Sequence, residues 1–284
     1  MNRMYGKLPQ EIGNLKNLVV FQLYENNFSG ELPAGFGDLH HLTSFSVYRN
    51  SFSGKFPANL GRFSPLNSID ISENQFSGGF PEFLCENGNL QLLLALGNNF
   101  SGVLPDSYAK CKTLERFRIS KNRMSGKIPD GFWALPLATM IDFGDNGFSG
   151  GISLDIGVST SLNQLILLNN RFSGKLPSAL GKLTNLEKLY LNNNDFSGKM
   201  PSEFGALKQL SSFHLEKNSL TGSIPPELGQ CTRLVDLNLA QNSLSGNIPS
   251  YIFTDDLIEF SESVRKSVNR SDSGRFREIE VKFH

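Results

Sequence analysis

The fold of this chain is decided by one 24-residue stretch, LTNLEKLYLNNNDFSGKMPSEFGA (183–206). Leu189 and Leu191 alternate there with polar neighbours, and a period of two predicts a short strand with one buried face and one wet face. Asn194 follows the strand, where its carboxamide can bond backbone groups of its own turn and of the neighbouring turn. We therefore expect a strand that ends in a polar turn.

The second half of the stretch returns the chain to the start of the next strand. Phe196 is expected to point inward, and Gly198 permits a tight bend because glycine tolerates a positive φ. Met200–Pro201 is expected to begin a second extended segment. Phe204 and then Leu207 lead back to the sheet.

The same pattern recurs along the chain at a constant interval of 24 residues. An asparagine opens each copy of N-x-F-S-G-x-x-P, and these asparagines are Asn26, Asn50, Asn74, Asn98, Asn122, Asn146, Asn170, Asn194, Asn218 and Asn242. The apolar positions of a copy contribute roughly 1.5–3 kcal/mol each when buried, against about 1–2 kcal/mol for each ordered backbone position. One copy alone is therefore unstable, and it folds only when neighbouring copies cover it.

Stacked copies predict a right-handed solenoid over residues 1–252, made of a partial first repeat and ten full repeats. A parallel sheet is expected on its concave side and 3₁₀ or irregular segments on its convex side. The pattern resembles the leucine-rich repeat, which belongs to the α/β type. The segments GKLP (174–177), GSIP (222–225) and GNIP (246–249) resemble its plant extracellular subclass.

The sixth repeat departs from this pattern. Ala138 stands where a leucine is expected, Ser153 replaces the turn proline, and Ser159 replaces the leucine that opens the next unit. Either the sheet is looser and bent at this point, or the changes reflect neutral drift.

The period fails after Ile252, and residues 253–284 are rich in charges of both signs. Thr254 is suited to cap a short helix over residues 255–268. This tail either covers the last repeat, or is poorly ordered, or is an artefact of where the chain was truncated.

The composition excludes several classes of protein. Lys plus Arg and Asp plus Glu are both 27, so the net charge of zero argues against binding nucleic acid or an anionic membrane through bulk charge. No apolar run approaches the length of a membrane span, and the N-terminal MNRMYGKLPQ lacks the apolar core of a signal peptide. We expect no cofactor or metal, because none of the four histidines pairs with Cys or a carboxylate at metal spacing. No nucleophile and base are arranged for catalysis, so we expect no enzyme.

The wet side of each strand is the default binding surface of such a solenoid. It consists of the residues six, four and two positions before each repeat asparagine. Leu92, Leu94 and Leu96 form an apolar stripe on this side, which costs solubility unless something covers it.

Next to the stripe, Arg116 and Arg118 leave the same face of one strand. Two guanidinium groups side by side suit a carboxylate, because each offers planar paired donors. A free peptide C-terminus would satisfy both. The alternative is a solvated surface pair balanced by Glu115 or by Asp142, which we place on the next-but-one row.

Further along this surface, His214 lies between Tyr190 and Asn238. It is either a ligand contact or a plain surface residue.

Cysteine and asparagine chemistry gives weaker signals. Cys111 and Cys231 occupy the apolar slot that opens a repeat, which favours buried thiols, while a Cys85–Cys111 bridge is the alternative. Asn-x-Ser glycosylation sequences are found at Asn27, Asn99 and Asn269.

A closer resemblance rests on four segments: LVVFQLYENNFSGELPAGF (18–36), FSPLNSIDISENQFSG (63–78), FLCEN (83–87) and RFRIS (116–120). They look like the ectodomain of plant receptor kinases for C-terminally encoded peptides, which belong to the same subfamily as the abscission-peptide receptors.

In that subfamily an Arg-x-Arg pair on the concave sheet receives the free C-terminus of a small secreted peptide, and Arg116-Phe117-Arg118 matches it. The resemblance implies a location at the extracellular face of the plasma membrane. It also implies a co-receptor of the somatic embryogenesis receptor kinase type. The kinase motifs G-x-G-x-x-G, H-R-D and D-F-G are absent from the sequence. The signal peptide and membrane helix of the family are also expected to be absent.

We therefore predict a peptide-binding ectodomain fragment of such a receptor. Its predicted peptide-binding residues are Arg116, Arg118, Leu92, Leu94, Leu96, Asp142, Tyr190 and His214. The alternatives are a secreted inhibitor of a cell-wall hydrolase, which would use a broader charged surface, and a truncated product without function.

Overall fold

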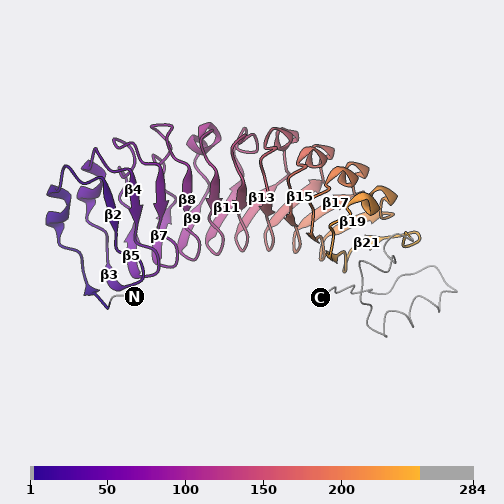
Figure 1. Ribbon diagram of the computed structural model, residues 1–284. Coiled ribbons are helices and arrows are strands. Elements are labelled where there is room, and N and C mark those ends of the chain that lie inside the picture. The colour runs from indigo at the N-terminus through magenta and orange to yellow at the C-terminus, as the bar shows by residue number, and fades with distance from the viewer. Residues whose placement is uncertain (1–2, 250–284) are drawn as a thin grey trace. The chain divides into compact units, whose positions relative to one another are not determined.

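The structure is a computed structural model that describes residues 3–249 (Figure 1). It consists of two compact units, Met1–Ser149 and Gly150–His284, each of which is described by itself. The predicted tail 253–284, its helix 255–268 and the glycosylation sequence at Asn269 lie outside the described residues.

Short parallel strands on the concave side carry the wet positions identified above. In the first unit they follow one another in the order β2 (Val20–Gln22), β4 (Ser44–Ser46), β6 (Ser68–Asp70), β8 (Leu92–Leu94), β10 (Arg116–Arg118) and β12 (Met140–Asp142). In the second unit the order is β14 (Gln164–Ile166), β16 (Lys188–Tyr190), β18 (Ser212–His214) and β20 (Asp236–Asn238). Residues 24 apart pair directly, so equivalent side chains form straight rows across each unit.

A second row of strands forms where the N-x-F-S-G segments lie side by side. It contains β1 (Tyr5–Gly6), β3 (Asn27–Gly30), β5 (Ser51–Lys55), β7 (Gln75–Gly79), β9 (Asn99–Gly102), β11 (Arg123–Lys127) and β13 (Gly147–Gly150), and then β15 (Arg171–Lys175), β17 (Asp195–Gly198), β19 (Ser219–Gly222) and β21 (Ser243–Leu244). The expectation that the second extended segment begins at Met200–Pro201 is therefore wrong, because the strand β17 ends before it. Parallel pairing of Gly174 with Phe196 holds this segment extended.

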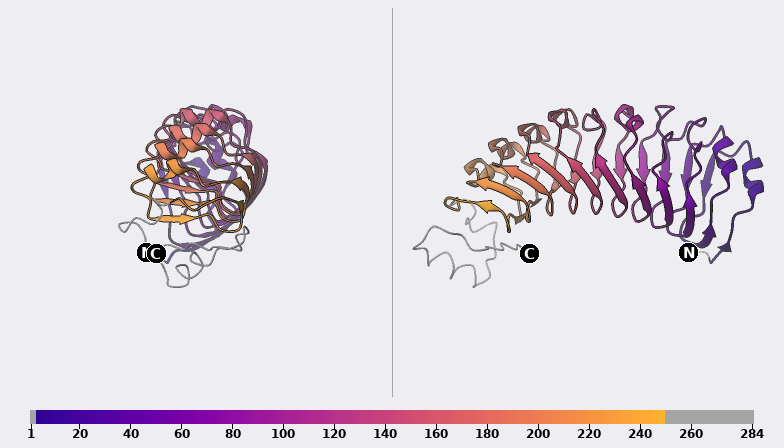
Figure 2. Two further views of the ribbon diagram at one scale, coloured as in Figure 1. Left: turned by 90° about the vertical axis from the view of Figure 1, so that its right-hand side faces the viewer. Right: turned by 180° about the vertical axis from the view of Figure 1, so that it is seen from behind.

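The convex side carries short 3₁₀ helices, as the repeat pattern predicts. They are η1 (Gln10–Asn14), η2 (Ala34–Asp38), η3 (Asp106–Lys110), η4 (Leu154–Val158), η5 (Ser178–Lys182), η6 (Ser202–Ala206) and η7 (Pro226–Gln230). Within each unit these turns line one side of the stack and the strands lie across from them (Figure 2). The predicted leucine-rich repeat solenoid is confirmed.

The repeat asparagines hold consecutive turns together. Asn74 accepts a hydrogen bond from the backbone N–H of Phe52 at 3.0 Å and donates to the carbonyl of Val47 at 3.0 Å, both in the preceding repeat. It also donates to Ile71 and Ser72 of its own turn. The two roles predicted for the repeat asparagine are confirmed, because its carboxamide pairs backbone groups of both turns.

Stacked phenylalanines fill the space behind the asparagines. The rings of Phe52, Phe76 and Phe100 follow one another at centroid distances of 6.3 and 6.2 Å, and Phe172 and Phe196 repeat the arrangement in the second unit at 6.3 Å. The inward direction predicted for Phe196 is confirmed, since its side chain is fully buried.

The sixth repeat keeps its 3₁₀ turn despite its altered sequence. Ser153, which replaces the proline, caps η4: its Oγ accepts a hydrogen bond from the backbone N–H of Asp155 at 3.2 Å. Ala138 and Ser159 are buried like the leucines they replace. The substitutions therefore change the side chains of this repeat but preserve its backbone turn.

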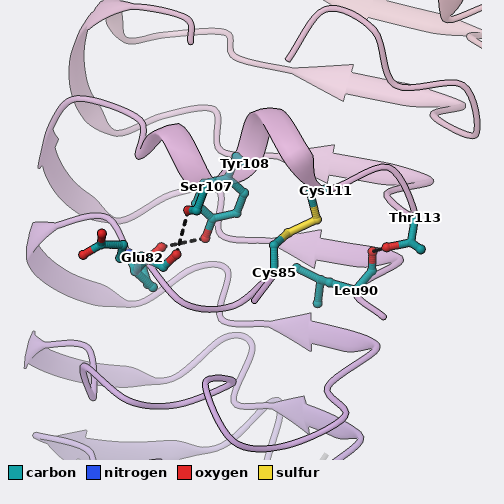
Figure 3. Close-up of a disulfide and its surroundings, with 8 residues drawn as sticks. Glu82, Cys85, Leu90, Ser107, Tyr108, Cys111 and Thr113 are labelled. Atoms are coloured by element: carbon teal, nitrogen blue, oxygen red, sulfur yellow. Dashed lines mark hydrogen bonds between the residues drawn. A yellow bond between two sulfur atoms is a disulfide. The ribbon is translucent and has the colours of Figure 1, made fainter. Parts of the chain in front are cut away.

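A disulfide between Cys85 and Cys111 joins two consecutive repeats of the first unit (Figure 3). Beside it, the buried hydroxyl of Tyr108 donates to the carbonyl of Pro81 at 2.7 Å, and burial raises the pKa of this tyrosine well above its usual value. The interpretation of Cys111 as a free thiol is wrong, and the alternative bridge is correct. Cys231 is a free buried thiol, as predicted, and burial raises its pKa.

Candidate functional site

The two arginines of β10 lie on the concave face of the first unit. Between them Phe117 is fully buried, because successive side chains of a strand point to opposite faces. Arg116 is exposed, and the Arg118 side chain keeps 30% of its accessible surface. The sequence placed both on one face of one strand, and the structure gives them this arrangement.

Arg118 is held by an acidic neighbour. Its Nε donates to Oδ2 of Asp142 at 3.2 Å. Asp142 is only 4% exposed and also accepts hydrogen bonds from the Ser120 hydroxyl at 2.8 Å and from the Gly144 backbone N–H at 3.1 Å. The placement of Asp142 on the next-but-one row is wrong: β12 pairs directly with β10, and Arg118 is opposite Asp142 in the register.

Arg116 is bound differently. Its Nη2 donates to the Sδ of Met140 at 3.7 Å, a weak contact with a soft acceptor. Within residues 3–249 no ion pair reaches Arg116, and Glu115 pairs with neither arginine. Arg116 therefore keeps its full charge at the surface.

The three leucines of the apolar stripe lie on the side of β10 that faces β6. Leu92 and Leu94 stand between Ser68 and Asp70 on one side and the arginines on the other. Straight rows bring these neighbours close, so Leu92, Leu94 and Leu96 are half-buried rather than open to water. The surface beside the arginines is thus apolar but already partly covered.

Asp70 completes this part of the concave face. Its Oδ1 accepts the backbone N–H of Ser72 at 3.0 Å. Burial raises the pKa of the Asp70 carboxyl, while the bond to Ser72 and the charge of Arg118 act in the opposite direction. Asp70 is thus protonated more readily than an exposed aspartate, although it forms no direct bond to Arg118.

The second unit carries a separate polar cluster. The rings of Tyr190 and His214 stack at a centroid distance of 4.7 Å, and Nε2 of His214 lies 2.9 Å from Oδ2 of Asp236. The hydroxyl of Ser212 donates to the same carboxylate oxygen at 2.6 Å. Ser212 and Asp236 were not predicted as site residues. They lie directly opposite each other in the register, and only the bond from His214 to Asp236 runs diagonally.

Glu216 lies on the same face as this cluster. Burial raises the pKa of its carboxyl, and the charges of His214 and Lys217 lower it. Ser212 bonds Asp236 and not the His214 ring, so these residues do not form the relay of a serine nucleophile.

The glycosylation sequences lie on the second row of strands. Asn27 is exposed at the start of β3, and Asn99 is half-buried at the start of β9.

Between residues 3 and 249 no group of three or more His, Cys, Asp or Glu side chains is arranged to hold a metal ion. No helix in that range has the length and apolar character needed to cross a bilayer.

Comparison with known proteins places these repeats in context. The Leucine Rich Repeat family model matches residues 17–39, 65–87, 161–183, 185–207, 209–231 and 233–254. No curated protein matches the sequence.

Solved structures resemble the chain more extensively. The ectodomain of the Arabidopsis receptor kinase HAESA, in complex with an N-terminally extended IDA peptide hormone, is 41% identical with a TM-score of 0.87 over 89% of this chain and 42% of its own. HAESA with IDA and the co-receptor SERK1 is 36% identical, with a TM-score of 0.71 over 88% of this chain and 50% of its own. The ectodomain of GASSHO1/SCHENGEN3 from Arabidopsis thaliana, in complex with CASPARIAN STRIP INTEGRITY FACTOR 2, is 33% identical, with a TM-score of 0.75 over 89% of this chain and 33% of its own.

The chain therefore spans between a third and a half of the length of these ectodomains. The family model matches six segments of the chain, and the three solved structures share its fold. The chain is a leucine-rich repeat solenoid whose structural neighbours are the ectodomains of plant receptor kinases.

Proposed function

We propose that the concave face of the first unit binds the C-terminal carboxylate of a small secreted peptide through Arg116 and Arg118. The observation that carries the proposal is the pair of guanidinium groups on one rigid strand, one exposed and the other half-exposed. Arg116 has no carboxylate partner among residues 3–249, so its charge is available to a ligand. Two arginines of this kind offer paired donors that match a carboxylate.

The half-buried leucines extend the same surface. Leu92, Leu94 and Leu96 supply an apolar floor for the last side chains of an extended peptide, beside the cations that receive its end. A peptide bound here lies across neighbouring strands that are about 4.8 Å apart. In the second unit, Tyr190 and His214 form a separate polar surface, and we propose it as a further contact surface for a ligand.

The relatives support a receptor of this kind. HAESA and GASSHO1/SCHENGEN3 were solved with peptide ligands, and HAESA also with the co-receptor SERK1. We propose that the chain belongs to an ectodomain at the extracellular face of the plasma membrane, in the subfamily of receptors for C-terminally encoded peptides and abscission peptides. A SERK-type kinase is its proposed co-receptor. The Cys85–Cys111 disulfide is in keeping with an oxidising compartment, and glycosylation is proposed at Asn27 and Asn99.

Isothermal titration calorimetry tests the proposal with two synthetic probes, the IDA peptide and a C-terminally encoded peptide. Each is prepared as the free acid and as the C-terminal amide. The free acid is expected to bind more tightly, because the amide removes the charge that the arginines receive. Equal affinities for the acid and the amide would show that this surface does not recognise the peptide carboxylate.

The arginines are tested by the double substitution Arg116→Ala with Arg118→Ala. We expect it to weaken binding of the free acid by about 2–5 kcal/mol. Arg123→Ala is the matched control, because Arg123 is an exposed arginine on β11, in the second row of strands. A similar loss in both variants would show that overall charge, not the paired site, attracts the peptide.

A further inference from the structure

The two arginines of β10 differ in how freely they move. Arg118 donates its Nε to Asp142, whereas Arg116 contacts only the thioether of Met140 in the described structure. One guanidinium is therefore oriented by a carboxylate and the other is free to adapt. The difference has a physical origin in the row positions, since Asp142 stands opposite Arg118 and Met140 stands opposite Arg116.

Asp142 is itself fixed from three sides. Oδ2 accepts from Arg118 Nε and from the Ser120 hydroxyl, and Oδ1 accepts from the backbone N–H of Gly144. A carboxylate that is 4% exposed needs such donors to stay buried. The Asp142 carboxylate is therefore held in place and nearly closed to solvent.

We propose that Asp142 is a positioning residue that holds Arg118 by its Nε and leaves the two Nη atoms for an end-on pair with the peptide carboxylate. This inference rests on the proposed function. Arginine loses rotamer freedom when a ligand fixes it, so orienting it beforehand strengthens binding. Arg116 then closes on the same carboxylate from the neighbouring position of the strand.

The charge of Asp142 has an opposing effect, because a carboxylate near the site repels an incoming carboxylate. Asp70 separates the two effects. It lies in the same row two strands from Arg118, on the side of Leu94 and opposite to Asp142, but its bond goes to Ser72 and not to Arg118. Asp70→Asn removes a charge only, while Asp142→Asn removes a charge and weakens the bond that orients Arg118.

Titration calorimetry of the full chain compares these two variants, with the IDA peptide as free acid and as amide. Asp142→Asn is expected to lower the affinity for the free acid about tenfold. It should leave the affinity for the amide unchanged, since only the acid uses the oriented guanidinium. Asp70→Asn is expected not to lower the affinity for the free acid. Unchanged or tighter binding of the acid by Asp142→Asn would overturn the proposal.

A second variant covers the case in which Asp142→Asn fails to fold. Ser120→Ala removes one donor to Asp142 and keeps the carboxylate. It is expected to lower the affinity for the free acid about threefold, because Asp142 loses one of its three hydrogen-bond donors. Binding identical to that of the wild-type protein would contradict the positioning role.

NMR of the arginine side chains gives a readout that needs no peptide. The Nε–H signal of Arg118, assigned from its loss in Arg118→Lys, is expected to exchange with water at least tenfold more slowly than that of Arg116. In Asp142→Asn the two rates should approach each other. Equal rates in the wild-type protein would overturn the positioning role. If neither probe peptide binds the wild-type protein, the proposed function fails, and these exchange rates alone decide the positioning of Arg118.

Discussion

The concave faces of the two units use the same strand register for different chemistry. In the first unit the ion pair runs straight across the sheet, from Arg118 to the residue opposite it, and Asp142 is 4% exposed. In the second unit the pair runs diagonally from His214, and the side chain of Asp236 is 38% exposed. Arg118 is thus paired with a buried carboxylate directly opposite, whereas His214 meets an exposed carboxylate across the diagonal.

The largest effect we expect concerns the cores behind the two faces. Phe117 of β10 and Phe213 of β18 occupy equivalent fully buried positions, but Phe117 packs against several rings, including Tyr108 and Phe132, while Phe213 contacts Phe204. Replacing either by alanine should lower the free energy of unfolding by about 3–5 kcal/mol, with Phe117→Ala at the upper end. Urea unfolding measures both. A larger loss for Phe213→Ala would mean that the aromatic cluster adds nothing to the first unit.

The disulfide should distinguish the units next. Cys85 and Cys111 are separated by 26 residues, and opening a loop of that size by the double serine substitution should cost about 3 kcal/mol. Hydrogen exchange followed by mass spectrometry should show faster exchange within residues 3–149 and unchanged exchange within residues 150–249. Equal acceleration in both ranges would contradict a stabilising effect confined to the first unit. Cys231→Ala controls for the loss of a buried thiol.

The Arg118–Asp142 and His214–Asp236 contacts provide a direct test of straight against diagonal geometry. Asp142→Asn should lower the free energy of unfolding by about 1–3 kcal/mol, because a buried carboxylate with three donors is lost. Asp236→Asn should cost less than about 1 kcal/mol, as is usual for exposed pairs. Thermal unfolding at neutral pH measures both variants. Equal losses would show that burial of the carboxylate does not decide the strength of the pair.

The smallest expected effect concerns the raised pKa values of Asp70 and Glu216, one in each unit. Burial favours the neutral carboxyl in the folded protein, so the stability contributed by each group is complete at low pH and is lost as pH rises through the raised pKa. Asp70→Asn and Glu216→Gln do not titrate. Relative to the wild-type protein, both should therefore gain stability between acidic and neutral pH, which melting temperatures across that range would measure. A relative gain toward acidic pH would contradict the raised values.

The repeat period predicted the backbone well, because it depends on residue types that act locally. Alternating leucines gave the strand β16, and Asn194 and Phe196 took the positions expected of them. The second row of strands was not predicted, since the segment at Asp195–Gly198 reads as a turn until a neighbouring copy pairs with it.

Side-chain partners were harder to predict than strand positions. The period places Arg118, His214 and Asp236 in their rows, but whether a bond runs straight or diagonally depends on side-chain length and rotamer. The disulfide likewise depends on the direction of two Cβ atoms, which spacing along the chain does not fix.

The asparagine hydrogen bonds give the stack an inherent polarity. Each carboxamide reaches back to the previous turn, so that the Phe52 amide and the Val47 carbonyl find their partner in Asn74 of the following turn. Shortening the array from its C-terminal side therefore leaves buried amide and carbonyl groups of the main chain without a hydrogen-bond partner. Shortening it from the other side removes different main-chain partners, such as the Val19 carbonyl that accepts the backbone N–H of Thr43. During synthesis on the ribosome, each turn is accordingly completed by the arrival of the following one.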